Sequence, residues 1–168
     1  LVPVLDDGLF SADEGALLAQ LEQLDGSGKW RVPNPAPDVD PELEALPLEL
    51  SYRSGDGDGG RWAPFGKNAV HVALAGAAYA AAGVAGVQVL GVLGTVLAAL
   101  AAALLARRVD ARLAPWALWA TGVATPLLFD THLAMAHTLA AALAVFAALA
   151  ALRVVDRVAA GAPPWGAA

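Results

Sequence analysis

The stretch that decides the fold is AVHVALAGAAYAAAGVAGVQVLGVLGTVLAALAAALLA, residues 69–106, which has no charged side chain. A helix needs about 20 apolar residues to cross the hydrocarbon core of a bilayer. The stretch is therefore too long for one upright span and too short for two, and Gly83-Val84-Ala85-Gly86 divides it best. We predict a juxtamembrane apolar helix within residues 68–85 and a transmembrane helix over residues 86–106.

Two more apolar stretches of spanning length follow. Residues 113–129 form the second predicted span, which is interrupted at Thr125-Pro126 because proline lacks the amide and its ring clashes with the preceding turn. Residues 133–152 form the third span and carry no charge. Basic residues follow the first and third spans, and by the positive-inside bias these ends are cytoplasmic. They are Arg107, Arg108, Arg112, Arg153 and Arg157.

The charges of the chain are divided unevenly. Of its 168 residues, 58% are hydrophobic and the net charge is −6. Residues 1–67 hold 13 of the 16 acids and have a net charge of −8, whereas residues 68–168 have a net charge of +2. No basic stripe is present to neutralise phosphates, which argues against nucleic-acid binding. We predict an all-α integral membrane protein of the cell membrane, with residues 1–67 extracytoplasmic, three transmembrane helices within 86–157 and a tail over 158–168.

The acidic segment is predicted to contain one amphipathic helix, over residues 12–25. Ser11 and Glu14 have the spacing of a capping box, and Gly26 follows as a stop. Four leucines recur on one face, at positions 17, 18, 21 and 24. Residues 26–62 are rich in glycine and proline, which predicts a long solvent loop with a short strand or turn at 46–53.

Asp13 and Glu14 are the first candidates for chemistry. Adjacent carboxylates at the start of a helix that lies against a membrane can supply a general base or ligate a divalent cation. That cation is the one cofactor the sequence suggests. Acids in a first helical turn also favour the helix dipole and cap free amides, which is the more frequent role.

Asp130, His132 and His137 form the second group. Asp130 and His132 fall in the predicted outer turn, and His137 falls about one turn inside the third span. Polar groups at membrane depth usually have a role, here with a phosphate or a proton. The alternative is that the first two are solvated and that His137 hydrogen-bonds a neighbouring span. The two histidines are five residues apart and do not share a helix face, which disfavours a zinc site.

Lys67, Arg61 and His71 border the first apolar stretch on the outer side. They are candidates to bind an anionic lipid phosphate at the bilayer surface. Lys67 can equally extend from the end of a helix towards water.

Four short motifs, in their order along the chain, resemble those of the GT-C superfamily of integral-membrane glycosyltransferases, such as protein O-mannosyltransferases and aminoarabinose transferases. The chain departs from the family pattern in two places. The family often has His-Pro-Pro where this chain has Asn68-Ala69-Val70-His71. In the second outer loop, the usual acidic or Glu-Ala-Arg residues are replaced by Asp130-Thr131-His132-Leu133. The motifs are Phe10-Ser11-Ala12-Asp13-Glu14-Gly15-Ala16, Leu104-Leu105-Ala106-Arg107-Arg108, Thr125-Pro126-Leu127-Leu128-Phe129-Asp130-Thr131-His132 and Ala150-Ala151-Leu152-Arg153.

The resemblance implies transfer of a sugar from a polyprenyl-phosphate donor to an acceptor at the outer membrane face. Asp13 would be the general base, and Glu14 would support it or a metal. Asp130, the nearest acid to a second catalytic carboxylate, would position the acceptor or the phosphate together with His132. Lys67 or Arg61 would offset the charge of the leaving phosphate. The resemblance also implies a span before Leu1 and several after Ala168.

Two other functions are compatible with the sequence. One is a small non-catalytic helical membrane protein or subunit whose acidic outer segment binds a partner. The other is a transporter fragment, which ranks last because the charges between residues 69 and 152 all fall at predicted helix ends.

Overall fold

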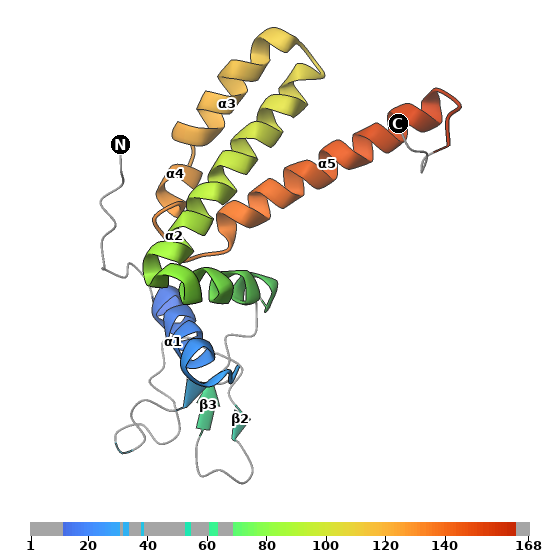
Figure 1. Ribbon diagram of the computed structural model, residues 1–168. Helices are drawn as coiled ribbons and strands as arrows, with labels where there is room; N and C mark the ends of the chain where they lie inside the picture. The colour runs from blue at the N-terminus through green and yellow to red at the C-terminus, as the bar shows by residue number, and fades with distance from the viewer. Residues whose placement is uncertain are drawn as a thin grey trace. The chain divides into compact units, whose positions relative to one another are not determined.

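The computed structural model describes residues 12–30, 32–33, 38, 53–54, 61–63 and 69–163. The described chain is mostly helical, as predicted (Figure 1). It divides into two compact units. The first comprises residues 1–90 and 133–136, and the second comprises residues 91–132 and 137–168.

The first unit is built around helix α1, Ala12–Ser27. Leu17 and Leu21 are buried in its core, and Leu18 and Leu24 pack at the edge, so the predicted leucine face is confirmed. The helix continues past the predicted stop at Gly26. Its end is marked by Gly28, which has φ of 68° and donates its amide to the Leu24 carbonyl at 2.8 Å. A positive φ favours glycine, and glycine in this conformation commonly ends a helix.

A small antiparallel sheet also belongs to the first unit. Its strands are β1 (Val32–Pro33), β2 (Arg53–Ser54) and β3 (Arg61–Ala63), in the order β1-β3-β2. The sequence predicted a solvent loop here, with a short strand or turn at 46–53. Residues 46–52 lie outside the described part, and Arg53 begins β2. The Gln20 side chain donates to the Trp30 carbonyl at 2.8 Å and so ties the chain before β1 to α1.

Helix α2, Ala69–Arg107, carries the long apolar stretch. The backbone leaves helical geometry at Ala82 and at Gly83, whose φ is 61°. The division predicted at residues 83–86 is therefore confirmed. Before the break, Val72 and Ala75 contribute to the core of the first unit. After the break, residues 84–107 extend for roughly 36 Å at 1.5 Å per residue.

Two helices among the described residues are long and apolar enough to cross a membrane: α2, and α5 over His137–Ala159. The predicted second span is not a single long helix. It comprises the 3₁₀ helix η1 (Ala111–Leu113), α3 (Ala114–Val123) and α4 (Leu127–Asp130). The interruption expected at Thr125-Pro126 separates α3 from α4.

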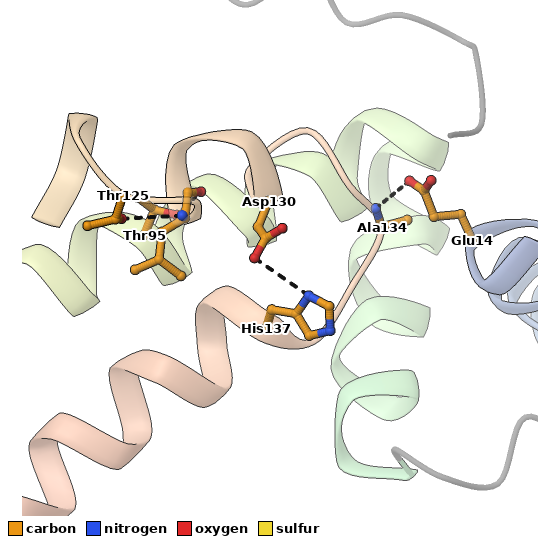
Figure 2. Close-up of polar contacts among 7 residues, drawn as sticks. Glu14, Thr95, Thr125, Asp130, Ala134 and His137 are labelled. Atoms are coloured by element: carbon orange, nitrogen blue, oxygen red, sulfur yellow. Dashed lines mark hydrogen bonds and ion pairs between the residues drawn. The ribbon is translucent and has the colours of Figure 1, made fainter. Parts of the chain in front are cut away.

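Side-chain hydroxyls bind the backbone at this interruption. Thr125 Oγ1 donates to the Thr121 carbonyl at 2.8 Å and accepts the Leu127 amide at 3.3 Å. Thr95 of α2 donates its hydroxyl to the Leu127 carbonyl at 3.2 Å (Figure 2). Proline removes a backbone donor, and these threonines occupy backbone groups that an unbroken helix would pair internally.

Within the second unit, α3 and α4 run antiparallel beside α2. An added Cβ at Gly91 would lie 3.0 Å from the Thr131 carbonyl oxygen, and one at Gly122 would lie 3.7 Å from Ala99 Cβ. The neighbour of Ala99 is therefore in α3, and the neighbour of Gly91, which comes earlier in α2, is Thr131 after α4. This reversed order is that of antiparallel helices. The helix pair is closely packed because small residues lie between the backbones.

Helix α5 begins four residues later than the predicted third span and extends beyond it. Residues 133–136 do not continue the helix, because Leu133 and Ala134 are buried in the first unit. Thr138, Ala142 and Leu149 are the buried residues of α5. Their spacing places them on one face.

Gly94 provides a test of this packing. An added Cβ would overlap the Thr138 hydroxyl and lie 2.7 Å from the Leu139 amide nitrogen. We expect Gly94→Ala to lower the free energy of unfolding by about 1–3 kcal/mol, because α5 must shift. The measurement is thermal unfolding in detergent. Gly122→Ala is the control, since its Cβ makes only an ordinary contact. Equal stability of the two variants would contradict the close approach of α2 and α5.

Candidate functional site

Glu14 is the most strongly engaged of the predicted site residues. It lies in the first turn of α1 and is only 2% exposed. Its Oε1 accepts the backbone amide of Ala134 at 2.9 Å, across 120 residues of sequence (Figure 2). A carboxylate that accepts an N–H makes a stronger bond than a neutral acceptor does. Glu14 therefore fastens the start of α1 to the segment that precedes α5.

Asp13 precedes Glu14 in the same turn and is half-buried. No partner for its carboxylate occurs among the described residues. Ser11, the other half of the predicted capping box, lies outside them. Of the two adjacent acids, Glu14 alone has a partner for its carboxylate within the described part of the chain.

Asp130 and His137 lie close together in the second unit. Asp130 ends α4 and His137 begins α5, and Asp130 Oδ2 is 3.6 Å from His137 Nδ1 (Figure 2). The distance is that of an ion pair when the imidazole is protonated and is too long for a hydrogen bond. The Asp130 side chain is 20% exposed and that of His137 is 61% exposed. The sequence placed His137 one turn inside its helix, but the later start of α5 makes it the first residue.

The turn between these residues is held by local bonds. Thr131 is buried and its hydroxyl donates to the Leu128 carbonyl at 2.6 Å. His132 is half-buried, and its amide donates to the Phe129 carbonyl at 3.0 Å. The structure therefore groups Asp130 with His137 and places His132 beside them along the chain.

The third predicted group is described only in part. Lys67 and the side chain of Arg61 lie outside the described residues. His71 lies in the first turn of α2 and is buried. A buried imidazole in this position faces the protein interior, which differs from the exposed position expected for contact with a lipid phosphate.

Tyr79 adds a contact that the sequence did not indicate. It lies in α2 before the break at Ala82, and the Glu22 and Asp25 carboxylates of α1 lie near its hydroxyl. Burial raises the pKa of Tyr79, and the nearby Glu22 and Asp25 carboxylates raise it further. The phenol of Tyr79 therefore loses its proton less readily than an ordinary tyrosine does.

Among the described residues, no group of three or more histidine, aspartate or glutamate side chains is arranged to ligate a metal. No family model, curated protein or solved structure matches the chain. Two acidic positions and one imidazole, Glu14, Asp130 and His137, are placed by contacts that the structure describes. The sequence did not indicate Ala134 as the partner of Glu14, because nearly every residue carries a backbone amide and no residue type marks the one that is used.

The Glu14 contact generates a stability prediction. Glu14→Ala leaves the buried Ala134 amide without its acceptor, so we expect a loss of about 1–3 kcal/mol in the free energy of unfolding. Amide hydrogen exchange at Ala134 should accelerate at the same time. Glu14→Gln keeps an oxygen acceptor and should lose less. Asp13→Asn is the control, and an unchanged exchange rate in Glu14→Ala would contradict the contact.

Proposed function

We propose that the chain is an integral membrane protein in which residues 84–107 and α5 cross the bilayer. Both helices are apolar and long enough, and arginines follow the apolar part of each. The arginine ends are cytoplasmic by the positive-inside bias. Residues 1–67, with most of the acids, are then extracytoplasmic.

A third crossing is made by α3 and α4 together. Arg108, after α2, forms an ion pair with Asp156 near the end of α5, so both helices end at the same side of the second unit. The chain must return between them, and α3 and α4 run antiparallel to α2. From 114 to 130 they extend for roughly 26 Å. This return supports the predicted span at 113–129 as a broken helix.

Cysteine labelling tests this topology, because the chain has no cysteine of its own. Gly26 is exposed, with open space around an added Cβ, and Ala160 is exposed beyond α5. A membrane-impermeant maleimide should label Gly26→Cys in intact cells and Ala160→Cys only after permeabilisation. Labelling of both, or of Ala160→Cys alone, in intact cells would contradict the topology.

We further propose that the chain forms part of a GT-C-like glycosyltransferase, which uses a polyprenyl-phosphate sugar donor at the outer face of the membrane. The observation that carries this proposal is the bond between Glu14 and Ala134. It fastens the acidic start of α1 to the segment 133–136, which belongs to the same unit. An acid of the motif at residues 10–16 is thereby held in a defined place within the first unit.

The half-buried Asp13 carboxylate suits the role of general base. It would take the proton of the acceptor hydroxyl while that oxygen bonds to the anomeric carbon of the sugar. The bond from that carbon to the phosphate oxygen breaks, and the polyprenyl phosphate leaves with inversion at the carbon. Glu14 then acts as a positioning residue, because its carboxylate holds Ala134.

Asp130 and His137 suit the binding of acceptor or phosphate. The imidazole is exposed, and Asp130 lies beside one ring nitrogen. When protonated, His137 can face a phosphate, and when neutral it can accept a hydroxyl proton. His132 in the same turn supplies a second imidazole. Lys67 and Arg61 remain proposed partners of the leaving phosphate.

Asp13→Asn tests the catalytic role. Loss of a general base should lower sugar transfer by about 10² to 10⁴-fold. Transfer is measured in membranes from the intact parent protein, with labelled polyprenyl-phosphate sugars, and insertion is checked by the cysteine labelling above. Asp25→Asn, an exposed acid near the other end of α1, is the control. Full activity of Asp13→Asn would remove Asp13 from the reaction.

A further inference from the structure

Five arginines gather where the long helices of the second unit end. The Arg108–Asp156 ion pair joins the end of α2 to the end of α5. Every arginine of this end lies within four positions along the chain of one of these two partners. We define the arginine cluster as Arg107, Arg108, Arg112, Arg153 and Arg157.

The arginine cluster is not neutralised by its own carboxylates. Five arginines face two aspartates, for a net charge of +3. Asp156 pairs with Arg108, and Asp110 accepts the backbone amide of Arg112 at 2.8 Å. In the part of the chain that the structure describes, no carboxylate pairs with the side chains of the other four arginines. Arg107, Arg112 and Arg153 are exposed and Arg157 is half-buried.

Exposed apolar and aromatic side chains lie near these charges along the chain. Trp116 and Trp119 of α3, which follow Arg112 in the chain, are 75% and 63% exposed. On α5, Leu152, Val155 and Val158 are exposed between and beside the arginines. Indole rings favour the boundary between headgroups and acyl chains. A phospholipid offers a phosphate and an acyl chain together, whereas a dissolved anion offers only the charge.

We propose that the arginine cluster binds the headgroups of anionic phospholipids in the leaflet at this end. Guanidinium groups donate paired hydrogen bonds to phosphate oxygens, and Trp116 lies at the level of the headgroups. This inference rests on the proposed membrane insertion and is independent of sugar transfer. Orientation by the positive-inside bias needs only charge, whereas binding of the phosphate by a guanidinium fork depends on arginine itself.

Native mass spectrometry of the full chain in an uncharged detergent tests the proposal. Phosphatidylglycerol and phosphatidylcholine with the same acyl chains are added separately, and the fraction of protein that retains each lipid is measured. We expect phosphatidylglycerol to be retained preferentially. Excess inorganic phosphate should leave this preference unchanged. Equal retention of the two lipids, or loss of the preference with inorganic phosphate, would overturn the proposal.

Arg107, Arg153 and Arg157 have no side-chain partner among the described residues, so their combined substitution by Gln should preserve the fold. Because each arginine near an anionic surface adds to the attraction, loss of three should lower the preference by about 10²-fold. Substitution of the same three by Lys keeps the charge and should give an intermediate preference. Removal of three charges elsewhere, at Lys29, Arg31 and Arg53, is the matched control.

Unfolding temperatures of all the variants, measured in the same detergent, separate lipid binding from loss of structure. The expected result is similar unfolding temperatures in all variants, with the lipid preference lowest in the Gln variant of the three arginines, intermediate in the Lys variant and unchanged in the control. If that variant retains the preference, or if the control loses it equally, the arginine cluster is not the binding surface. Neither measurement involves a sugar donor, so failure here leaves the proposed transferase reaction untouched.

Discussion

The second unit depends on the close approach of helix backbones that carry almost no polar side chains. Gly94 brings α2 against Thr138 of α5, and Gly91 brings it against the turn after α4. In the proposed membrane setting, apolar side chains supply no hydrophobic drive for helices to associate, so contact between backbones and scattered hydrogen bonds would do so. The Thr95 hydroxyl on the Leu127 carbonyl and the Arg108–Asp156 pair are two such bonds, one on each neighbour of α2.

Much of the fold could be predicted because periodicity and helix breakers act locally. The leucines of α1, the division near Gly83 and the interruption at Pro126 follow from side-chain spacing or from backbone conformation. The errors arise where tertiary contacts prevail. α5 starts late because Leu133 and Ala134 are buried in the first unit, and nothing in the sequence near 133 indicates that burial. The β1 and β3 strands were missed because pairing of such short segments leaves no alternating pattern.

For the candidate site, residue types could be predicted but partners could not. The resemblance already assigned Asp13 as the base and Glu14 as its support, but the sequence could not indicate that Glu14 binds the Ala134 amide. Asp130 and His137 are seven residues apart across a predicted turn, and their approach depends on where α5 begins. Sequence spacing alone placed these two at different depths. His71, a surface candidate in the sequence, is buried.

The Glu14–Ala134 contact also constrains the order of assembly. Chains emerge from the ribosome with the N-terminus first, and domains generally fold as they become complete. Ala134 belongs to the core around Leu17 and Leu21, yet it lies 120 residues after Glu14. The N-terminal region therefore cannot finish folding when its own residues leave the ribosome. It must wait until α2, α3 and α4 have been synthesised, so a chain truncated within α3 would lack part of its first core.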